Sequence, residues 1–263
     1  MHAGRRPGSS GTEPEARLRT GRPRGRTEGS SPPPDGRPAG PGSVPRVRWP
    51  RRIATARRLQ ERLRVRIVMR GAPRRVRLVA GADCAFATDG RRIWAGIVVV
   101  SVPELEPVAE AWATAPVTFP YVPGFLSFRE GPVFLRAARR LRVRPDLWLF
   151  DGQGIAHPRG VGLAAHLGVL LDAPSIGCAK SRLIGEHDEP PGARGAWVPL
   201  RSEGRRIGAV LRTRTGVRPL YVSVGNRITL EPALRWVLAC CRCRVPEPIR
   251  LAEQLVNRRK RSR

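Results

Sequence analysis

A short, wholly apolar run constrains the fold more than any other stretch of this sequence. Leu147 to Phe150 reads Leu-Trp-Leu-Phe, and Asp151 and Gly152 follow it directly. A strand without a polar position is buried on both faces, which is typical of a parallel strand covered by helices. Apolar stripes with helical spacing lie on either side, from Phe134 to Leu141 and from Leu163 to Leu171. The middle of the chain is therefore predicted to alternate between helices and parallel strands.

The preceding part of the chain has a different pattern, that of an antiparallel meander. Strands are predicted from Val76 to Phe86 and from Ile93 to Val102, joined by an Asp89-Gly90 hairpin turn, and Val108 to Ala113 can add a third. A meander followed by parallel βαβ units makes an α/β protein whose mixed sheet is flanked by helices. This order is characteristic of the RNase H-like architecture. The other expected elements are a helix at Ile53–Leu63, strands at Ser175–Ala179, Val210–Thr213 and Leu220–Val224, and a closing helix at Leu234–Cys241.

Composition divides the chain into two tails and one folded domain. Residues 1–50 hold ten Pro and nine Gly with almost no large apolar residue, which is typical of a disordered segment. Folded structure is predicted over residues 51–255, and residues 256–263 are predicted to be a basic, solvated tail.

The charge of the chain favours a polyanionic partner. Its 263 residues carry 49 Lys+Arg against 21 Asp+Glu, a net charge of +28, and only two of the cations are lysines. Residues 1–50 supply +6 and the remainder +22. Nucleic acid or an anionic membrane surface would match this charge. A coding bias toward Arg, Gly, Pro and Ala would also produce it, so charge alone names no activity.

No feature of the sequence indicates a membrane or secreted protein. No apolar run approaches the roughly 18 residues of a transmembrane helix, and no signal peptide is visible. The five cysteines are an odd number, which fits a reduced cytoplasm. Cys240, Cys241 and Cys243 lack the paired spacing of a zinc site, and we interpret them as packing and surface thiols.

Three carboxylates stand at promising positions. Ligands of open α/β sheets sit beyond the carboxyl ends of strands, which is where Asp151 lies. Asp83 lies inside an apolar strand, where it needs a partner or a metal if it points inward and is an ordinary surface acid if it points outward. Glu130 either closes a capping box with Ser127 or stands free before a helix that begins at Pro132, which suits proline better. Spacing alone leaves open whether the three converge on a Mg²⁺ ion.

Four motifs resemble those of the endonuclease V family. Residues 120–130 read PYVPGFLSFRE, similar to the family's wedge motif, and residues 150–159 read FDGQGIAHPR, similar to its second signature. Residues 80–83 (AGAD) and 176–180 (IGCAK) match two further motifs in the same order. The resemblance covers residues 51–255, and several long motifs in order make it specific.

The resemblance implies a metal-dependent endonuclease of DNA repair with an RNase H-like fold. Such an enzyme recognises deaminated purines, chiefly inosine, and hydrolyses the second phosphodiester bond 3′ to the lesion, leaving a 3′-hydroxyl and a 5′-phosphate. The implied cofactor is Mg²⁺, with Mn²⁺ as a substitute, and the implied partner is DNA. We expect the protein to be a monomer located in the cytoplasm. A ribonuclease acting on inosine-containing RNA is an alternative that the sequence does not separate.

The resemblance also implies roles for particular residues. Asp83, Glu130 and Asp151 would be the metal ligands, and Lys180 would stabilise phosphate or position water. Tyr121 would be the wedge that fills the gap left by an extruded base. The remaining substrate contacts would come from Pro120, Pro123, Gly124, Gly152, His157, Gly177 and Leu183.

One position departs from the family pattern. Family members often have a Gly-His-Arg triplet where this chain has Gly225-Asn226-Arg227. The resemblance places Asn226 in the catalytic set with Asp83, Glu130, Asp151 and Lys180. Its carbonyl oxygen can coordinate a metal, but it cannot act as a base. A lesion-binding protein with reduced turnover is therefore a second alternative. His166 and His187 have no motif support.

Overall fold

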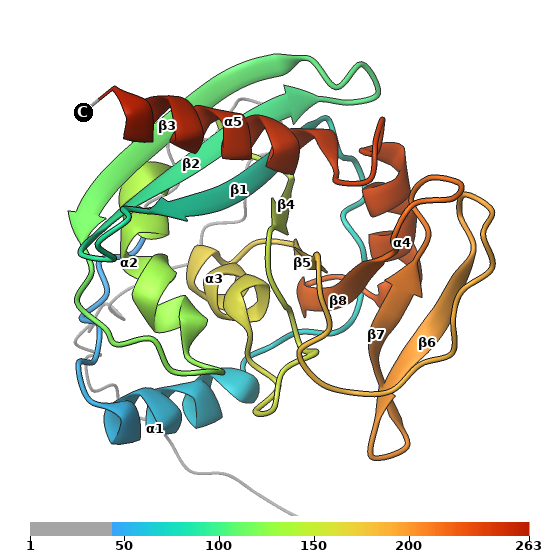
Figure 1. Cartoon of the computed structure of the whole chain (residues 1–263), viewed down its shortest axis with the longest axis horizontal. Helices are drawn as coiled ribbons and strands as arrows, with labels where there is room; N and C mark the ends of the chain where they lie inside the picture. The colour runs from blue at the N-terminus through green and yellow to red at the C-terminus, as the bar shows by residue number, and fades with distance from the viewer. Residues whose placement is uncertain (1–43, 263) are drawn as a thin grey trace, which may run out of the picture. The chain divides into compact units, whose positions relative to one another are not determined.

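A computed structural model describes residues 44–262 and shows an eight-stranded sheet in the order β3-β2-β1-β4-β5-β8-β7-β6 (Figure 1). The strands are β1 (Leu78–Phe86), β2 (Arg92–Ser101), β3 (Pro107–Pro116), β4 (Leu147–Phe150), β5 (Ser175–Ala179), β6 (Trp197–Ser202), β7 (Arg205–Leu211) and β8 (Leu220–Asn226). The helices are α1 (Ile53–Arg64), α2 (Leu126–Ala138), α3 (Leu163–Leu171), α4 (Leu230–Ala239) and α5 (Glu247–Arg261).

The pairing confirms the predicted RNase H-like arrangement. β1, β2 and β3 form an antiparallel meander, and β4 pairs in parallel with both β1 and β5. β8, β7 and β6 then extend the sheet in antiparallel fashion. The carboxyl ends of β4 and β5 therefore lie at one edge of the sheet, beside the second half of β1.

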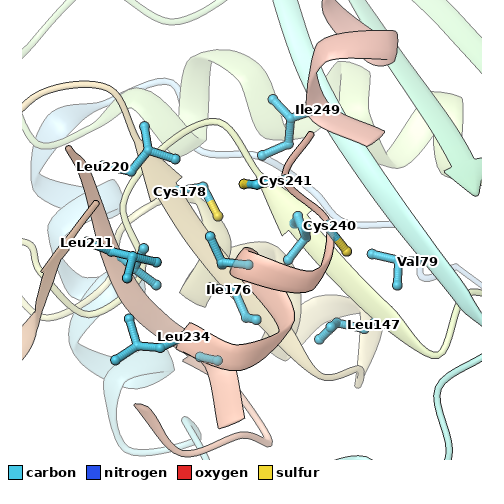
Figure 2. Packing of buried hydrophobic residues seen from close by; sticks show 14 of the residues in the cluster. Val79, Leu147, Ile176, Cys178, Leu211, Leu220, Leu234, Cys240, Cys241 and Ile249 are labelled. Atoms are coloured by element: carbon cyan, nitrogen blue, oxygen red, sulfur yellow. The ribbon is translucent and has the colours of Figure 1, made fainter. Parts of the chain in front are cut away.

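Apolar side chains cover both faces of the sheet. One face, with Val79, Leu147 and Ile176, packs against α4 and α5 (Figure 2), and the other packs against α2 and α3. Cys240 and Cys241 are buried in the first of these clusters, as the packing interpretation predicted. Each fully buried Leu or Ile side chain contributes about 1.5–3 kcal/mol, so both layers of helices are firmly held.

Helix α5 approaches β1 so closely that only glycine fits at residue 81. A Cβ atom built on Gly81 would lie 2.0 Å from the backbone carbonyl carbon of Pro248. Figure 1 shows α5 crossing the meander, and it contacts β1, β2 and β3. A glycine in a strand therefore marks the place where the backbone of the helix rests on the sheet.

Both readings of the segment around Glu130 were wrong. Helix α2 begins at Leu126, places Glu130 inside the helix and continues through Pro132. Ser127 makes no capping bond, because its hydroxyl is hydrogen-bonded to Nδ1 of His166 at 2.9 Å. Inside the helix, Gly131 lies under the Trp49 ring, where a Cβ atom would be 2.3 Å from Cη2.

The predicted boundaries of the tails also need correction. Residues 44–50 are not a free tail, since Val44, Val47 and Trp49 pack against the face that α2 and α3 cover. Residues 1–43 lie outside the described part of the chain. Residues 256–261 continue α5, because Val256 is buried in the core while Arg258 and Arg259 pair with Glu110 of β3. Over residues 44–262, no helix is long and apolar enough to cross a membrane.

Candidate functional site

The carboxyl edge of the parallel strands brings Asp83, Asp151 and Lys180 together. Asp151 directly follows β4, and its backbone N–H donates to the carbonyl of Ala82, one residue before Asp83 on β1. Lys180 directly follows β5, and its Nζ lies 2.8 Å from Oδ2 of Asp151. The ends of β4 and β5, beside Asp83 in the second half of β1, thus place two acids and one cation side by side.

Glu130 joins this group from helix α2. It is buried, and burial together with the charges of Asp83 and Asp151 raises its pKa to about 8. Burial and the charge of Asp151 likewise raise the pKa of Asp83 to about 7. The three carboxylates are thus near enough for the charges of Asp83 and Asp151 to act on Glu130.

This donor set suits a hard divalent cation. Carboxylate oxygens are the ligands that Mg²⁺ prefers, and a cation would relieve their mutual repulsion. As the side chains stand in residues 44–262, no three His, Cys, Asp or Glu side chains are placed to hold a metal ion together. Asp83, Glu130 and Asp151 are the residues that would hold such a cation, with the ammonium of Lys180 beside Asp151.

A pocket of about 350 Å³ opens beside the carboxylates. Its size is at the lower end of the range for ligand sites. Asp151 and Lys180 line it, so the pocket and the carboxylate edge are continuous. Six of the residues predicted to contact substrate line it as well: Tyr121, Pro123, Gly124, Gly152, His157 and Leu183.

The other two predicted contact residues stand back from the pocket wall. Pro120 is absent from the lining. Gly177 lies behind the lining, since a Cβ atom on it would be 2.5 Å from the carbonyl oxygen of the lining residue Gly152. The side chain of Tyr121 points outward, with 74% of its surface exposed.

The carbonyl oxygen of Gly124 is held by three donors. Nε2 of Gln60 and Nε2 of His157 lie 3.0 and 2.9 Å from it, and the guanidinium of Arg159 also donates to it. Nδ1 of His157 accepts the N–H of Arg159, so the proton of the neutral ring sits on Nε2. Burial lowers the pKa of His157 to about 4. The ring is therefore a neutral donor near pH 7 that fixes one wall of the pocket.

The family profile for Endonuclease V matches residues 61–254. The chain belongs to the endonuclease V family. The endonuclease V of Roseiflexus sp. (strain RS-1) is 51% identical over 210 residues, which cover 80% of this chain and 94% of that protein.

Solved structures of endonuclease V share the fold. The Streptomyces avermitilis protein superposes with a TM-score of 0.78 at 40% identity, covering 81% of this chain and 95% of that one. The Ciona intestinalis endonuclease V superposes with a TM-score of 0.70 at 26% identity, covering 80% and 98% of the two chains. That protein was crystallised in complex with a DNA that contains an inosine followed by a ribo-adenosine.

The structure contradicts the role predicted for Asn226. This residue ends β8 and pairs with Ser175, so it lies at the opposite end of β5 from Lys180. Its Nδ2 donates to the carbonyl of Gly168 at 3.1 Å, and its Oδ1 accepts the N–H of Val68 at 3.0 Å. Asn226 is a buried structural amide, and the reduced-turnover alternative that depended on it loses its basis.

Sequence reasoning missed an acid that does reach the site. Glu253 of α5 lies 3.4 Å from Nζ of Lys180, and its charge helps to raise the pKa of Asp83. The helix that carries it was overlooked, although Ile249, Ala252 and Val256 have the i, i+3, i+7 spacing of a buried stripe.

His166 was also overlooked, because no motif pointed to it. Its ring lies between Trp49 and Phe128, and burial lowers its pKa to about 3. Nδ1 bonds to the hydroxyl of Ser127, which lines the pocket, while Nε2 has no hydrogen-bond partner among residues 44–262. His166 therefore supports the pocket wall from inside the core.

Proposed function

We propose that this endonuclease V is a metal-dependent DNA repair nuclease that recognises inosine. It hydrolyses the second phosphodiester bond 3′ to the lesion and leaves a 3′-hydroxyl and a 5′-phosphate. The observation that carries the proposal is the continuity of one pocket with one carboxylate edge through Asp151 and Lys180. A base held in the pocket keeps its own backbone close to the acids.

The pocket would receive the extruded base. Moving a base out of the stack costs a few kcal/mol, and less when the base is poorly paired, so extrusion itself favours a lesion. The exposed ring of Tyr121 would fill the gap left in the stack. The glycine backbone of the pocket would present fixed polar groups to the edge of the base, and the neutral ring of His157 would hold the Gly124 wall in place.

The acids would act on the phosphate. Asp83, Glu130 and Asp151, with Glu253 beside them, would hold Mg²⁺, which Mn²⁺ can replace. When bound, the metal supplies Lewis-acid activation of water and stabilisation of the leaving oxygen. Burial opposes the charge of Lys180, but its hydrogen bond with Asp151 raises its pKa, so it stays an ammonium that can bind a phosphate oxygen.

The five free cysteines support a reducing, cytoplasmic location.

Incision mapping tests the proposal. The full chain with Mg²⁺ is expected to nick a deoxyinosine duplex one nucleotide beyond the lesion and to leave a matched adenine duplex intact. Asp151→Asn is expected to abolish nicking and retain binding of the lesion duplex. No nick with either Mg²⁺ or Mn²⁺, or undiminished nicking by the variant, would contradict the proposal.

Inosine-containing RNA is the second candidate substrate. The ribo-adenosine that follows the inosine in the Ciona intestinalis complex is the observation that favours it. A pocket that reads a base does not by itself distinguish ribose from deoxyribose, whereas a contact with the 2′-hydroxyl does. Cleavage rates on matched DNA and RNA strands of one sequence decide between them, and the faster strand identifies the substrate.

A further inference from the structure

The segment from residue 51 to residue 77, which contains α1 and the approach to β1, is almost purely cationic. It has eleven arginines and one acid, Glu61. All eleven arginines are exposed, and none takes part in any of the nine salt bridges of the described residues. The arginines are Arg51, Arg52, Arg57, Arg58, Arg62, Arg64, Arg66, Arg70, Arg74, Arg75 and Arg77.

A bias toward arginine codons does not account for this segment. In the second half of the chain, exposed arginines such as Arg206, Arg227 and Arg258 have carboxylate partners. In α1, Arg58 and Arg62 stand one turn apart, and like charges at this spacing destabilise a helix by about 0.2–0.5 kcal/mol. Glu61 is the single acid of this segment, so most of the repulsion between its arginines has no opposing charge, and a bound polyanion would relieve it.

This surface adjoins the pocket. The buried face of α1 carries Gln60, which donates to the pocket residue Gly124 and accepts the Nε–H of Arg159 at 2.6 Å. A Cβ atom built on Gly160 would lie 3.5 Å from Nε of Arg64. Arg57 is near enough to Arg159 for the two positive charges to affect each other. Arg57 and Arg64 of α1 thus lie beside Arg159 and Gly160, and the guanidinium of Arg159 holds the pocket residue Gly124.

We propose that Arg57, Arg64 and Arg159 form a phosphate-binding surface that continues from the pocket and holds the DNA backbone beside the extruded base. The inference rests on the proposed function, because it treats the pocket as the position of the lesion. A helix of 12 residues is about 18 Å long, which matches about five phosphates of one strand at 3.4 Å each. Binding here is independent of base sequence.

The salt dependence of binding tests this surface directly. Each phosphate contact contributes about 0.9 to the slope of log K against log salt. Arg57→Gln with Arg64→Gln is therefore expected to reduce the slope by about 1.8. Between 50 and 200 mM salt, the wild type would lose roughly 12-fold more affinity than the double variant. Arg159 stays unchanged, because it also holds Gly124.

The matched control removes two charges elsewhere. Arg205 and Arg214 are exposed, have no salt bridge among the described residues and lie on or beside β7. Arg205→Gln with Arg214→Gln is expected to leave the slope unchanged. The single variants Arg57→Gln and Arg64→Gln, each expected to reduce it by about 0.9, keep the test valid should the double variant misfold.

The measurement uses an undamaged DNA duplex without divalent metal, so it does not depend on incision. Equal slopes for the wild type and the Arg57 and Arg64 variants, or an equal reduction in the control, would overturn the proposal. A reduction seen with duplex RNA but not with DNA would overturn the choice of DNA. Failure of the incision assay beside a reduced slope would count against the proposed function alone.

Discussion

Gln60 offers the sharpest test of how the pocket is held. Its side chain is fully buried and makes three hydrogen bonds. Nε2 donates to the carbonyls of Gly124 and Val161 at 3.0 and 3.2 Å, and Oε1 accepts from Arg159 at 2.6 Å. Gln60→Leu keeps an apolar stem of similar volume and removes all three bonds, so the change isolates their contribution.

The expected loss of stability follows from these contacts. A typical hydrogen bond contributes about 1 kcal/mol, and a buried group left without a partner costs about 1–3 kcal/mol. The carbonyl of Gly124 keeps two other donors, whereas the carbonyl of Val161 loses its side-chain donor and Arg159 its acceptor. We expect the unfolding free energy to fall by about 3 kcal/mol and the Tm by about 6–12 °C for a domain of this size.

Urea denaturation followed by circular dichroism measures the change. The control is Gln254→Leu, since Gln254 is exposed on α5, and its substitution is expected to shift stability by less than about 0.5 kcal/mol. A loss for Gln60→Leu no larger than that of the control would refute the reasoning. Because Gln60 also orients Gly124, its replacement is further expected to raise KM for a lesion duplex more than it lowers kcat.

Three further predictions concern the carboxylates, the wedge and the sheet. In the folded chain the pKa of Asp83 is raised to about 7 and that of Glu130 to about 8, so the metal-free fold holds protons that the unfolded chain has released. Its Tm is therefore expected to fall from pH 6.5 to pH 8. This window lies above the pH range in which the lowered pKa values of His157 and His166 affect stability. Mg²⁺ is expected to restore the Tm at pH 8, and a flat metal-free profile would contradict the coupling. Tyr121→Ala is expected to cost about 1–3 kcal/mol in affinity for a lesion duplex with an unchanged Tm, since its ring is exposed; equal affinity would remove the wedge role. Gly81→Ala is expected to lower stability by at least about 1–3 kcal/mol in thermal unfolding, because its Cβ would meet the backbone of Pro248, and a neutral result would show that α5 can shift.

The local sequence pattern was sufficient to place a site residue when that residue directly follows a strand that the pattern predicts. The apolar run before Asp151 predicted both β4 and the placement of that acid at the strand's end, and the strand before Lys180 did the same. Contacts between distant segments were not predictable in this way. Trp49 packs over Gly131 of α2, and no property of residues 126–132 reveals this contact.

The error at Asn226 has a topological cause. The resemblance placed Asn226 in the catalytic set, but β8 runs antiparallel to β5 and ends at the other side of the sheet from Lys180. Strand direction depends on the order of pairing, which local sequence does not reveal. Glu253 was missed for the complementary reason, since its position depends on how α5 lies across the meander.

The close packing of α5 on β1 makes the site depend on the order of synthesis. Asp83 and Glu253 meet in space, but a ribosome must make all eight strands before it makes the helix that carries Glu253. A nascent chain stopped before residue 247 has the earlier motifs, yet it lacks an acid of the site and the apolar stripe that covers Val79. The ribosome therefore makes the motifs that contain Asp83, Glu130, Asp151 and Lys180 before the site can be completed by α5.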